Sequence, residues 1–196
     1  MTKANLLDDK YWETRYIEHR TGWDIGYPNK VLTDFVENNL PKTARILVPG
    51  AGKAYEVEHL WGLGYKNVYA LDFSKTAKSI FTDRVLDFPE EQFITEDFFE
   101  LNEQFDAILE QTFFCALSPN LRKRYVDQTH KLLNPGGTLF GLMFNFDKPK
   151  GPPFGGSIEE YQSLFETKFS IKRMEACVES IPQRLGNELI VELIKK

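Results

Sequence analysis

The residues best suited to chemistry lie in one short turn, ILVPGAGKAYE at residues 46–56. An apolar run breaks at Pro49 into small residues, and a stretch compatible with a helix follows. Gly50 and Gly52 have no Cβ, so the backbone there can approach a ligand that any other side chain would push away. In an open α/β sheet, the first turn from strand to helix is the usual contact for a bound nucleotide. The alternative interpretation is a tight turn without a ligand, which is a common use of glycine.

The spacing of these small residues distinguishes between nucleotides. Dinucleotide-binding enzymes use G-x-G-x-x-G/A, and the third residue after Gly52 is the bulky Tyr55. The chain instead has Gly50-x-Gly52-x-Ala54, a spacing typical of S-adenosylmethionine sites. Asp72 ends the next apolar run, where a carboxylate can accept hydrogen bonds from both ribose hydroxyls. NAD sites use the same device, and a turn or capping aspartate is an equally good interpretation of Asp72.

Two further segments have polar or small residues at one end of a predicted strand. In TEDF at 95–98, Asp97 can accept a hydrogen bond from an adenine amino group, and Phe98 would lie near the purine. The segment LLNPGGTL at 132–139 places a Pro-Gly-Gly turn before a strand, as methyltransferases commonly do. Each signal is weak alone, and together they favour S-adenosylmethionine over NAD.

The elements that must position these residues alternate along the chain. Strands are predicted at 44–48, 67–73, 92–95, 105–111, 137–146, 169–178 and 187–196, and helices at 5–18, 30–39, 55–64, 74–88, 119–133 and 158–165. This alternation predicts an α/β fold with a doubly wound, mostly parallel, seven-stranded sheet. Only ESIPQRLG separates the last two strands, which predicts a C-terminal antiparallel hairpin. We expect one domain over residues 1–196, with an N-terminal helical cap at about 1–40.

Composition limits the setting in which the chain works. The net charge is −5 and no Lys/Arg cluster is long enough for a nucleic-acid track. No apolar run approaches the ~20 residues needed to span a bilayer, and the N-terminus lacks the apolar core of a signal peptide. Cys115 and Cys177 are too few for a disulfide framework, and with the scattered His19, His59 and His130 they lack metal-ligand spacing. We expect a cytoplasmic protein that acts on a small molecule or anion, without metal, membrane or nucleic acid.

Several motifs extend the prediction toward both ends of the chain. They are YW at 11–12, TGWDIG at 21–26, VPGAGK at 48–53, TFFCAL at 112–117, Pro119-x-x-Arg122 and GPPF at 151–154. In combination they resemble the thiopurine S-methyltransferase family over residues 10–195. The segment IPQRLGNE at 181–188 is more similar to the plant thiol, thiocyanate and halide methyltransferase branch than to the animal thiopurine branch. The resemblance implies a Rossmann-like, class I S-adenosylmethionine-dependent methyltransferase.

The resemblance also implies a set of cofactor contacts. They fall on Trp12, Tyr16, Trp23, Gly50, Asp72, Asp97, Phe98 and Gln111, with Gly52 in the same turn as Gly50. Tyr16 stands where the plant branch has Trp, and Glu110-Gln111 stands where it has Asp-Tyr. Trp12 and Tyr16 are four residues apart and lie on one helical face, where aromatic rings can stabilise a sulfonium by ~0.5–2 kcal/mol, or simply pack in the core. Trp23, in a glycine-flanked loop, fits a cofactor lid better than a core residue.

Methyl transfer to a soft anion requires few catalytic groups from the protein. Opposite charges cancel in the transition state, so a dry site accelerates the reaction and no general base is needed. Phe113, Phe114 and Phe154 are candidates for the apolar wall of the acceptor site, or else core residues. Arg122 and Arg184 are candidates for attracting an anionic substrate, or else solvated arginines.

The sequence thus predicts a methyltransferase acting on a small thiol, bisulfide, thiocyanate or halide. One alternative is a small-molecule O- or N-methyltransferase, for which Glu110 is the candidate base. A second alternative is a non-catalytic module that binds S-adenosylmethionine and acts through a partner protein. The acceptor within the predicted class and the oligomeric state stay open at this point.

Overall fold

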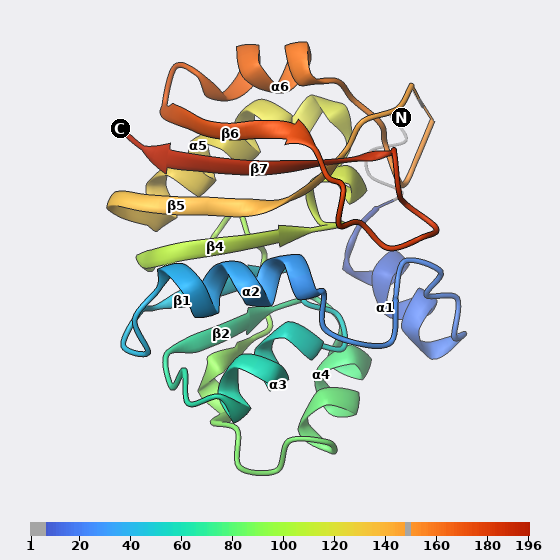
Figure 1. The fold of residues 1–196 in the computed structure, drawn as a ribbon. Helices are drawn as coiled ribbons and strands as arrows, with labels where there is room; N and C mark the ends of the chain where they lie inside the picture. The colour runs from blue at the N-terminus through green and yellow to red at the C-terminus, as the bar shows by residue number, and fades with distance from the viewer. Residues whose placement is uncertain (1–6, 148–149) are drawn as a thin grey trace.

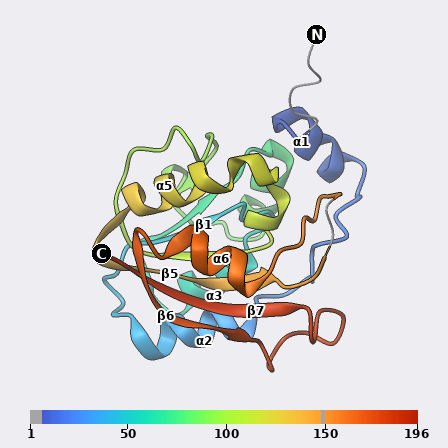
Figure 2. The same cartoon turned by 90° about the horizontal axis from the view of Figure 1, so that it is seen from above.

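The computed structural model describes residues 7–147 and 150–196, which form a mixed sheet covered by helices on both faces (Figures 1 and 2). The strands are β1 (Ile46–Pro49), β2 (Val68–Leu71), β3 (Phe93–Ile94), β4 (Phe105–Gln111), β5 (Leu133–Phe144), β6 (Phe169–Ala176) and β7 (Glu188–Lys195). The helices are α1 (Asp9–Ile17), α2 (Lys30–Asn39), α3 (Tyr55–Gly62), α4 (Lys75–Thr82), α5 (Arg122–Leu132) and α6 (Ile158–Phe165), with short 3-10 turns at Glu90–Gln92, Phe114–Ala116 and Pro119–Leu121.

The seven strands of the described residues lie in the order β3-β2-β1-β4-β5-β7-β6. Neighbouring strands from β3 to β5 pair in parallel, whereas β7 pairs antiparallel with both β5 and β6. This topology confirms the predicted doubly wound, mostly parallel sheet and its C-terminal hairpin. Because β1, β2 and β4 are parallel neighbours, the turns that follow them meet at one edge of the sheet. Figures 1 and 2 show α1 beside that edge.

Two apolar cores lie on the two faces of the sheet. Residues of α2, α3 and α4 fill one core, in which Phe35 stacks on Phe140 of β5 with ring centroids 3.8 Å apart. Residues of α5 and α6 fill the other, around Tyr125, Tyr161 and Phe165. Every residue of β1 is buried, as expected for a central parallel strand covered on both faces.

The predicted helix 74–88 is shorter than expected. Its start is confirmed, since Ser74 Oγ accepts a hydrogen bond from the Ala77 amide at 3.0 Å. It ends at Thr82, and Phe88 turns back to pack edge-on against Phe81 with ring centroids 4.9 Å apart. The apolar residues after Thr82 therefore serve a tertiary contact rather than a longer helix.

The predicted helices at 5–18 and 119–133 also change at their starts. The first begins at Asp9 after the Asp8 cap, and residues 1–6 of the predicted cap lie outside the described residues. The second begins as a 3-10 turn at Pro119–Leu121 and becomes α-helical only at Arg122. Pro119 still occupies the first position, as predicted.

Gly141 is the glycine of the sheet whose replacement should cost most. It lies opposite Glu110 in the pairing of β5 with β4, and a Cβ there would lie 2.2 Å from the Glu110 carbonyl oxygen. Gly141→Ala should therefore lower the free energy of unfolding by about 3 kcal/mol or more, because two central strands must separate. Gly62→Ala at the end of α3 is the control, since nothing lies within 4 Å of its added Cβ. Urea unfolding of both variants is the measurement, and equal midpoints would contradict the expectation.

Candidate functional site

The turn after β1 has a left-handed backbone at every second residue. Gly50, Gly52 and Ala54 have φ values of 60°, 56° and 55°. A Cβ at Gly50 would lie 2.6 Å from Cδ2 of Phe113, and a Cβ at Gly52 would lie 2.5 Å from the Tyr16 hydroxyl. Backbone conformation and close contact both exclude larger residues at the two glycines. The tight turn is confirmed, and aromatic side chains pack against the face that the glycines leave open.

Asp72 joins the turns that follow β1 and β2. Its Oδ2 accepts a hydrogen bond from the Gly52 amide at 2.8 Å, and its Oδ1 accepts one from the Ser74 amide at 2.9 Å. Burial raises the pKa of Asp72 to about 6, although the two amides act in the opposite direction. Each carboxylate oxygen can accept a second hydrogen bond. Asp72 thus has a turn role, and its contact with the two hydroxyls of a ribose stays a prediction.

An aromatic cluster of Trp12, Tyr16 and Trp23 lies beside the glycine turn. Trp23 meets Trp12 and Tyr16 edge-on, with ring centroids 5.3 Å and 5.8 Å apart. Tyr16 is buried against Gly52, and Trp12 projects from the same face of α1, as their spacing predicts. Electron-rich ring faces at this place suit the sulfonium of S-adenosylmethionine.

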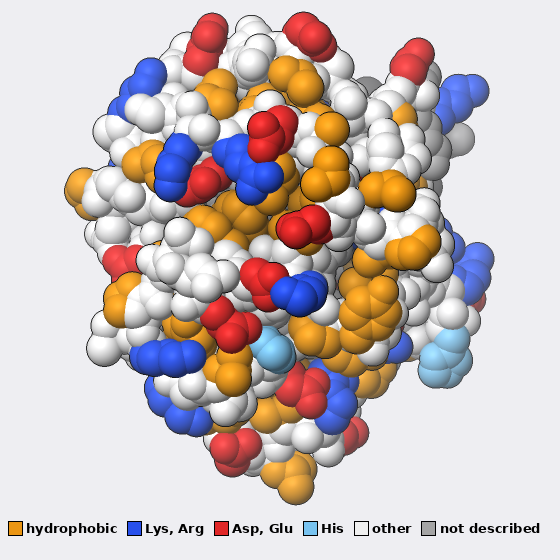
Figure 3. Space-filling view, in the orientation of Figure 1, with side chains coloured by type: hydrophobic (Ala, Val, Ile, Leu, Met, Phe, Trp, Pro, Cys, Tyr) orange, Lys and Arg blue, Asp and Glu red, His pale blue; other side chains and the backbone are white. Residues whose placement is uncertain are grey.

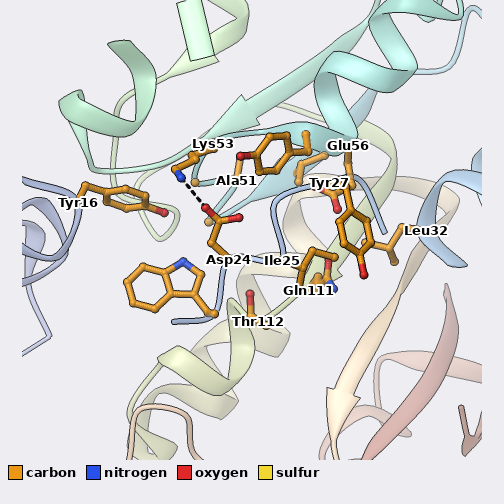
Figure 4. Close-up of a pocket in the computed structure, with 15 residues that line it drawn as sticks. Tyr16, Asp24, Ile25, Tyr27, Leu32, Ala51, Lys53, Glu56, Gln111 and Thr112 are labelled. Carbon is orange, nitrogen blue, oxygen red and sulfur yellow. Dashed lines mark ion pairs between the residues drawn. The ribbon is translucent and has the colours of Figure 1, made fainter. Parts of the chain in front are cut away.

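The loop at 21–27 closes over the site and is fastened on two sides. Lys53 of the glycine turn pairs with Asp24 at 2.7 Å (Figure 4), and Arg184 donates to the Trp23 carbonyl oxygen at 2.6 Å. The cavity that remains below the loop measures about 60 Å³. This volume is smaller than the roughly 300–1,000 Å³ that small-molecule sites usually measure. The sequence singled out Trp23 but not the ion pair that holds its loop.

Gln111 is the last residue of β4 and lines the cavity. Its side chain contacts residues from three other segments of the chain. With its amide oxygen toward the donors, it accepts from Asn29 at 2.7 Å and from Arg184 at 3.3 Å, and it donates to Glu56 at 3.2 Å. Burial raises the pKa of Glu56, which also accepts from the Asn29 backbone amide. Sequence reasoning missed Asn29 and Glu56, because a helix cap and a first-turn acid are what these positions carry in ordinary helices.

Asp97 and Phe98 lie after β3 in local and core contacts. The Asp97 carboxylate accepts a hydrogen bond from the Phe99 amide at 2.8 Å. The Phe98 ring is 1% exposed and packs between Phe113 and Tyr125. Their contact with an adenine therefore stays a prediction.

The three predicted wall residues separate into different environments. Phe113 lies against Gly50, next to the cavity-lining Thr112, and its place in the wall of the acceptor site stays a prediction. Phe114 is 1% exposed and packs with Tyr125 and Tyr161 in the core of the opposite face, so its core interpretation holds. The backbone amide of Phe154 donates to the carbonyl oxygen of Cys115 at 2.7 Å, which joins its segment to the turn after β4.

The two predicted arginines are both engaged with the protein. The Arg122 side chain is 6% exposed, pairs with Glu160 and donates to the Gly155 carbonyl oxygen at 2.6 Å. Arg122 is therefore not a solvated arginine. Its guanidinium group is paired with residues that do not line the cavity. Arg184 pairs with buried Glu188 and contacts Gln111, which makes it the better-placed candidate for an anionic acceptor.

Glu110 does not have the geometry of a general base. It is fully buried, does not line the cavity, and both of its oxygens are occupied. Oε1 accepts from the amides of Phe113 and Phe114 at 3.0 Å and 2.8 Å, and Oε2 accepts from the Tyr125 hydroxyl at 2.8 Å. A base must reach the proton that it abstracts. This geometry does not favour Glu110 as the base of an O- or N-methyltransferase.

Residues 7–147 and 150–196 contain no group of three or more His, Cys, Asp or Glu able to hold a metal ion. The same residues include no helix long and apolar enough to cross a membrane.

Solved structures with the same arrangement define the class of fold. The 1,6-didemethyltoxoflavin-N1-methyltransferase of Burkholderia thailandensis, solved with S-adenosylhomocysteine, aligns with a TM-score of 0.78 at 18% identity, covering 97% of this chain and 88% of that one. The magnesium protoporphyrin IX methyltransferase of Synechocystis, solved with S-adenosylmethionine, aligns with a TM-score of 0.72 at 18% identity over the whole of both chains. The fold is that of the class I, S-adenosylmethionine-dependent methyltransferases.

The sequence places the chain within one family of that class. The thiopurine S-methyltransferase (TPMT) family matches residues 7–193, and the chain belongs to this S-adenosylmethionine-dependent family. It is 38% identical over 159 residues to the probable thiol methyltransferase 2 of Arabidopsis thaliana, covering 78% of this chain and 70% of that one. It is 27% identical to the thiopurine S-methyltransferase of Acinetobacter baylyi, covering 92% and 94%. The predicted family and the predicted enzyme class are confirmed.

Replacing Asp72 should separate cofactor binding from folding. Asp72→Ala removes a charged acceptor for two ribose hydroxyls, each hydrogen bond being worth ~1.5–3 kcal/mol. The affinity for S-adenosylhomocysteine should then fall by roughly 100-fold or more, at ~1.4 kcal/mol per factor of ten. Calorimetric titration is the measurement, with the exposed Asp83→Ala as a control that keeps the parent affinity. An affinity within a few-fold of the parent for Asp72→Ala would restrict Asp72 to its turn role.

The affinity should also depend on pH in the range where Asp72 titrates. Burial raises the pKa of this carboxyl to about 6 in the free protein, and only the ionised form accepts from both hydroxyls. Cofactor binding favours the ionised form, so affinity should fall as the pH drops through 6 and level off above about 7. Titration with S-adenosylhomocysteine between pH 5 and 8 measures this, and a flat profile would contradict it.

Proposed function

We propose that the chain transfers a methyl group from S-adenosylmethionine to a small, soft nucleophile: a thiol, bisulfide, thiocyanate or halide. The observation that carries the proposal is the inward orientation of Glu110, with both oxygens occupied. This geometry supports a reaction that does not use Glu110 as a base, and soft anions are acceptors that need none. The names of the relatives support the choice, since one is a probable thiol methyltransferase and another, 29% identical over 189 residues, is thiocyanate methyltransferase 1 of Arabidopsis thaliana.

Different residues of the site would bind different parts of the cofactor. When bound, the cofactor supplies an electrophilic methyl group on a sulfonium sulfur. Asp72 would hold the ribose, and Trp12, Tyr16 and Trp23 would offer ring faces to the positive charge. Glu56, whose carboxylate lines the cavity, is the acid able to pair with the ammonium of the methionine part.

The loop at 21–27 would exclude water during the reaction. Charge cancellation in the transition state is more favourable where the dielectric is low. The Lys53–Asp24 pair and the Arg184 hydrogen bond to Trp23 would hold the loop closed. Phe113 would complete the apolar side of the site, with Phe154 behind it.

The setting that we propose is the cytoplasm, with one domain over residues 1–196 whose N-terminal cap includes α1 and α2. Two buried thiols, Cys115 and Cys177, fit a reducing compartment. Figure 3 shows basic and acidic side chains interspersed over one face, and the net charge is −5. These features support a small-molecule acceptor and neither a nucleic-acid nor a membrane partner.

A screen of acceptors tests the proposal directly. Iodide, thiocyanate, bisulfide and an aryl thiol are each incubated with labelled S-adenosylmethionine, and methylated product is measured. Iodide and thiocyanate stay anionic, so their turnover should change little between about pH 7 and 9, whereas a cysteine-like thiol should follow its ionisation near ~8.5. Binding of S-adenosylhomocysteine without turnover of any of these acceptors would reject the acceptor class and leave the cofactor assignment intact.

A further inference from the structure

The turn Thr112–Phe114 after β4 has an unusual backbone for its sequence. Thr112 has a φ of 59°, a left-handed conformation that costs a β-branched residue free energy. Such conformations persist only where surrounding contacts hold them, and they are frequent at functional sites. Thr112 lines the cavity, and the next residue, Phe113, packs against Gly50. The strained turn therefore forms part of the site wall.

Glu110 supplies the contacts that hold this turn. Its Oε1 accepts both amides that follow Thr112, those of Phe113 and Phe114, at 3.0 Å and 2.8 Å. The thiol of Cys115 adds one contact, donating to the Thr112 carbonyl oxygen at 3.3 Å. Because Thr112 is left-handed, the two amides that follow it can point at the same carboxylate oxygen.

The surroundings of Glu110 are built to keep its carboxylate in place. Gly141 lies beside it on β5, where a Cβ would come within 2.5 Å of the Glu110 Cβ. Tyr125 of α5 donates to Oε2 at 2.8 Å. The ionisable groups that face Glu110 are Tyr125, Cys115 and Tyr161, and burial raises the pKa of each, so they are neutral near pH 7. Backbone amides and a hydroxyl, rather than a cation, therefore stabilise the carboxylate.

The hydrogen bonds around Glu110 can persist when it takes up a proton. Burial raises its pKa to about 7, so both forms occur near neutral pH. Thr129 Oγ1 is buried without a partner and lies close to the Tyr125 hydroxyl. A protonated Oε2 can donate to Tyr125, which can then turn its hydrogen to Thr129, while Oε1 keeps both amides. A glutamine at position 110 can make the same set of hydrogen bonds as the protonated acid.

We propose that Glu110 is a positioning residue of the methyltransferase site, which fixes Thr112 in its left-handed conformation and thereby places Phe113 against Gly50. It acts through the turn and touches neither cofactor nor acceptor. The proposal rests on the family assignment and not on the choice of acceptor. Its effect should therefore appear in cofactor binding as well as in turnover.

Four variants test this role: Glu110→Gln, Glu110→Ala, Thr112→Gly and the double variant Glu110→Ala/Thr112→Gly. Calorimetry gives the dissociation constant for S-adenosylhomocysteine, and turnover is followed at pH 6 to 9 with whichever acceptor the parent uses. Glu110→Ala should weaken binding at least tenfold, because nothing then holds the turn. Glu110→Gln should stay within about threefold of the parent for binding and turnover across this range.

Thr112→Gly provides the decisive comparison. Glycine adopts a positive φ without help, so it should restore binding at least threefold in the Glu110→Ala background. The same change in the parent background completes the double-mutant cycle and corrects for the lost Thr112 side chain. Rescue by glycine is not expected if Glu110 only fills space in the core.

Three results would overturn the proposal. Loss of turnover in Glu110→Gln with unchanged cofactor binding would make Glu110 a proton acceptor after all. Absence of rescue by Thr112→Gly would reduce it to a core residue, and parent-like binding by Glu110→Ala would remove it from the site. If Glu110→Ala does not fold, Tyr125→Phe replaces it: this variant keeps the ring, removes the hydroxyl, and should weaken binding about threefold with the same rescue by glycine.

Discussion

The hydrogen bond from the Gly52 amide to Asp72 joins the ends of β1 and β2, and the geometry of the site depends on it. Parallel neighbours bring these two ends to the same edge of the sheet, but a shared edge does not by itself fix where the turns lie. With both amides of Gly52 and Ser74 on one buried carboxylate, the glycine turn and the start of α4 become a single unit. Because the two glycines have no Cβ, Tyr16 and Phe113 can pack against this turn from two different parts of the chain.

Segments far apart in the chain close the site over this unit. The loop at 21–27 reaches the glycine turn through Asp24 and the β6–β7 connection through the Trp23 carbonyl oxygen. The Arg184 side chain that makes the second contact is itself held by Glu188 and Gln111. Opening of this loop would break a partly buried ion pair, one hydrogen bond and the edge-on contacts of Trp23 with Trp12 and Tyr16.

Glu110 and Gln111 lie on opposite faces of β4. Successive side chains of a strand point to opposite faces, so Glu110 and Gln111 cannot lie in the same environment. Gln111 faces the cavity beside α2 and α3, and Glu110 faces α5, where Tyr125 meets it. The sequence alone offers Glu110 as a candidate base. In the structure, its carboxylate instead accepts hydrogen bonds from two amides of the turn that follows β4. Methyl transfer to a soft anion, which requires no base, is the chemistry consistent with that division.

The sequence by itself determined the features that rest on local patterns. Alternating periodicities identified the strands and helices, and four-residue spacing placed Trp12 and Tyr16 on one helical face. The Gly50-x-Gly52-x-Ala54 spacing and Asp72 predicted which edge of the sheet binds the nucleotide. Only the tertiary structure decided which candidates face the site. Arg122 meets Glu160, 38 residues away, and Arg184 meets Trp23, 161 residues away. The orientation of Glu110 depends on which helix covers which face of β4. The physical reason is that a side chain's environment is set by long-range packing, whereas spacing along the chain records only local geometry.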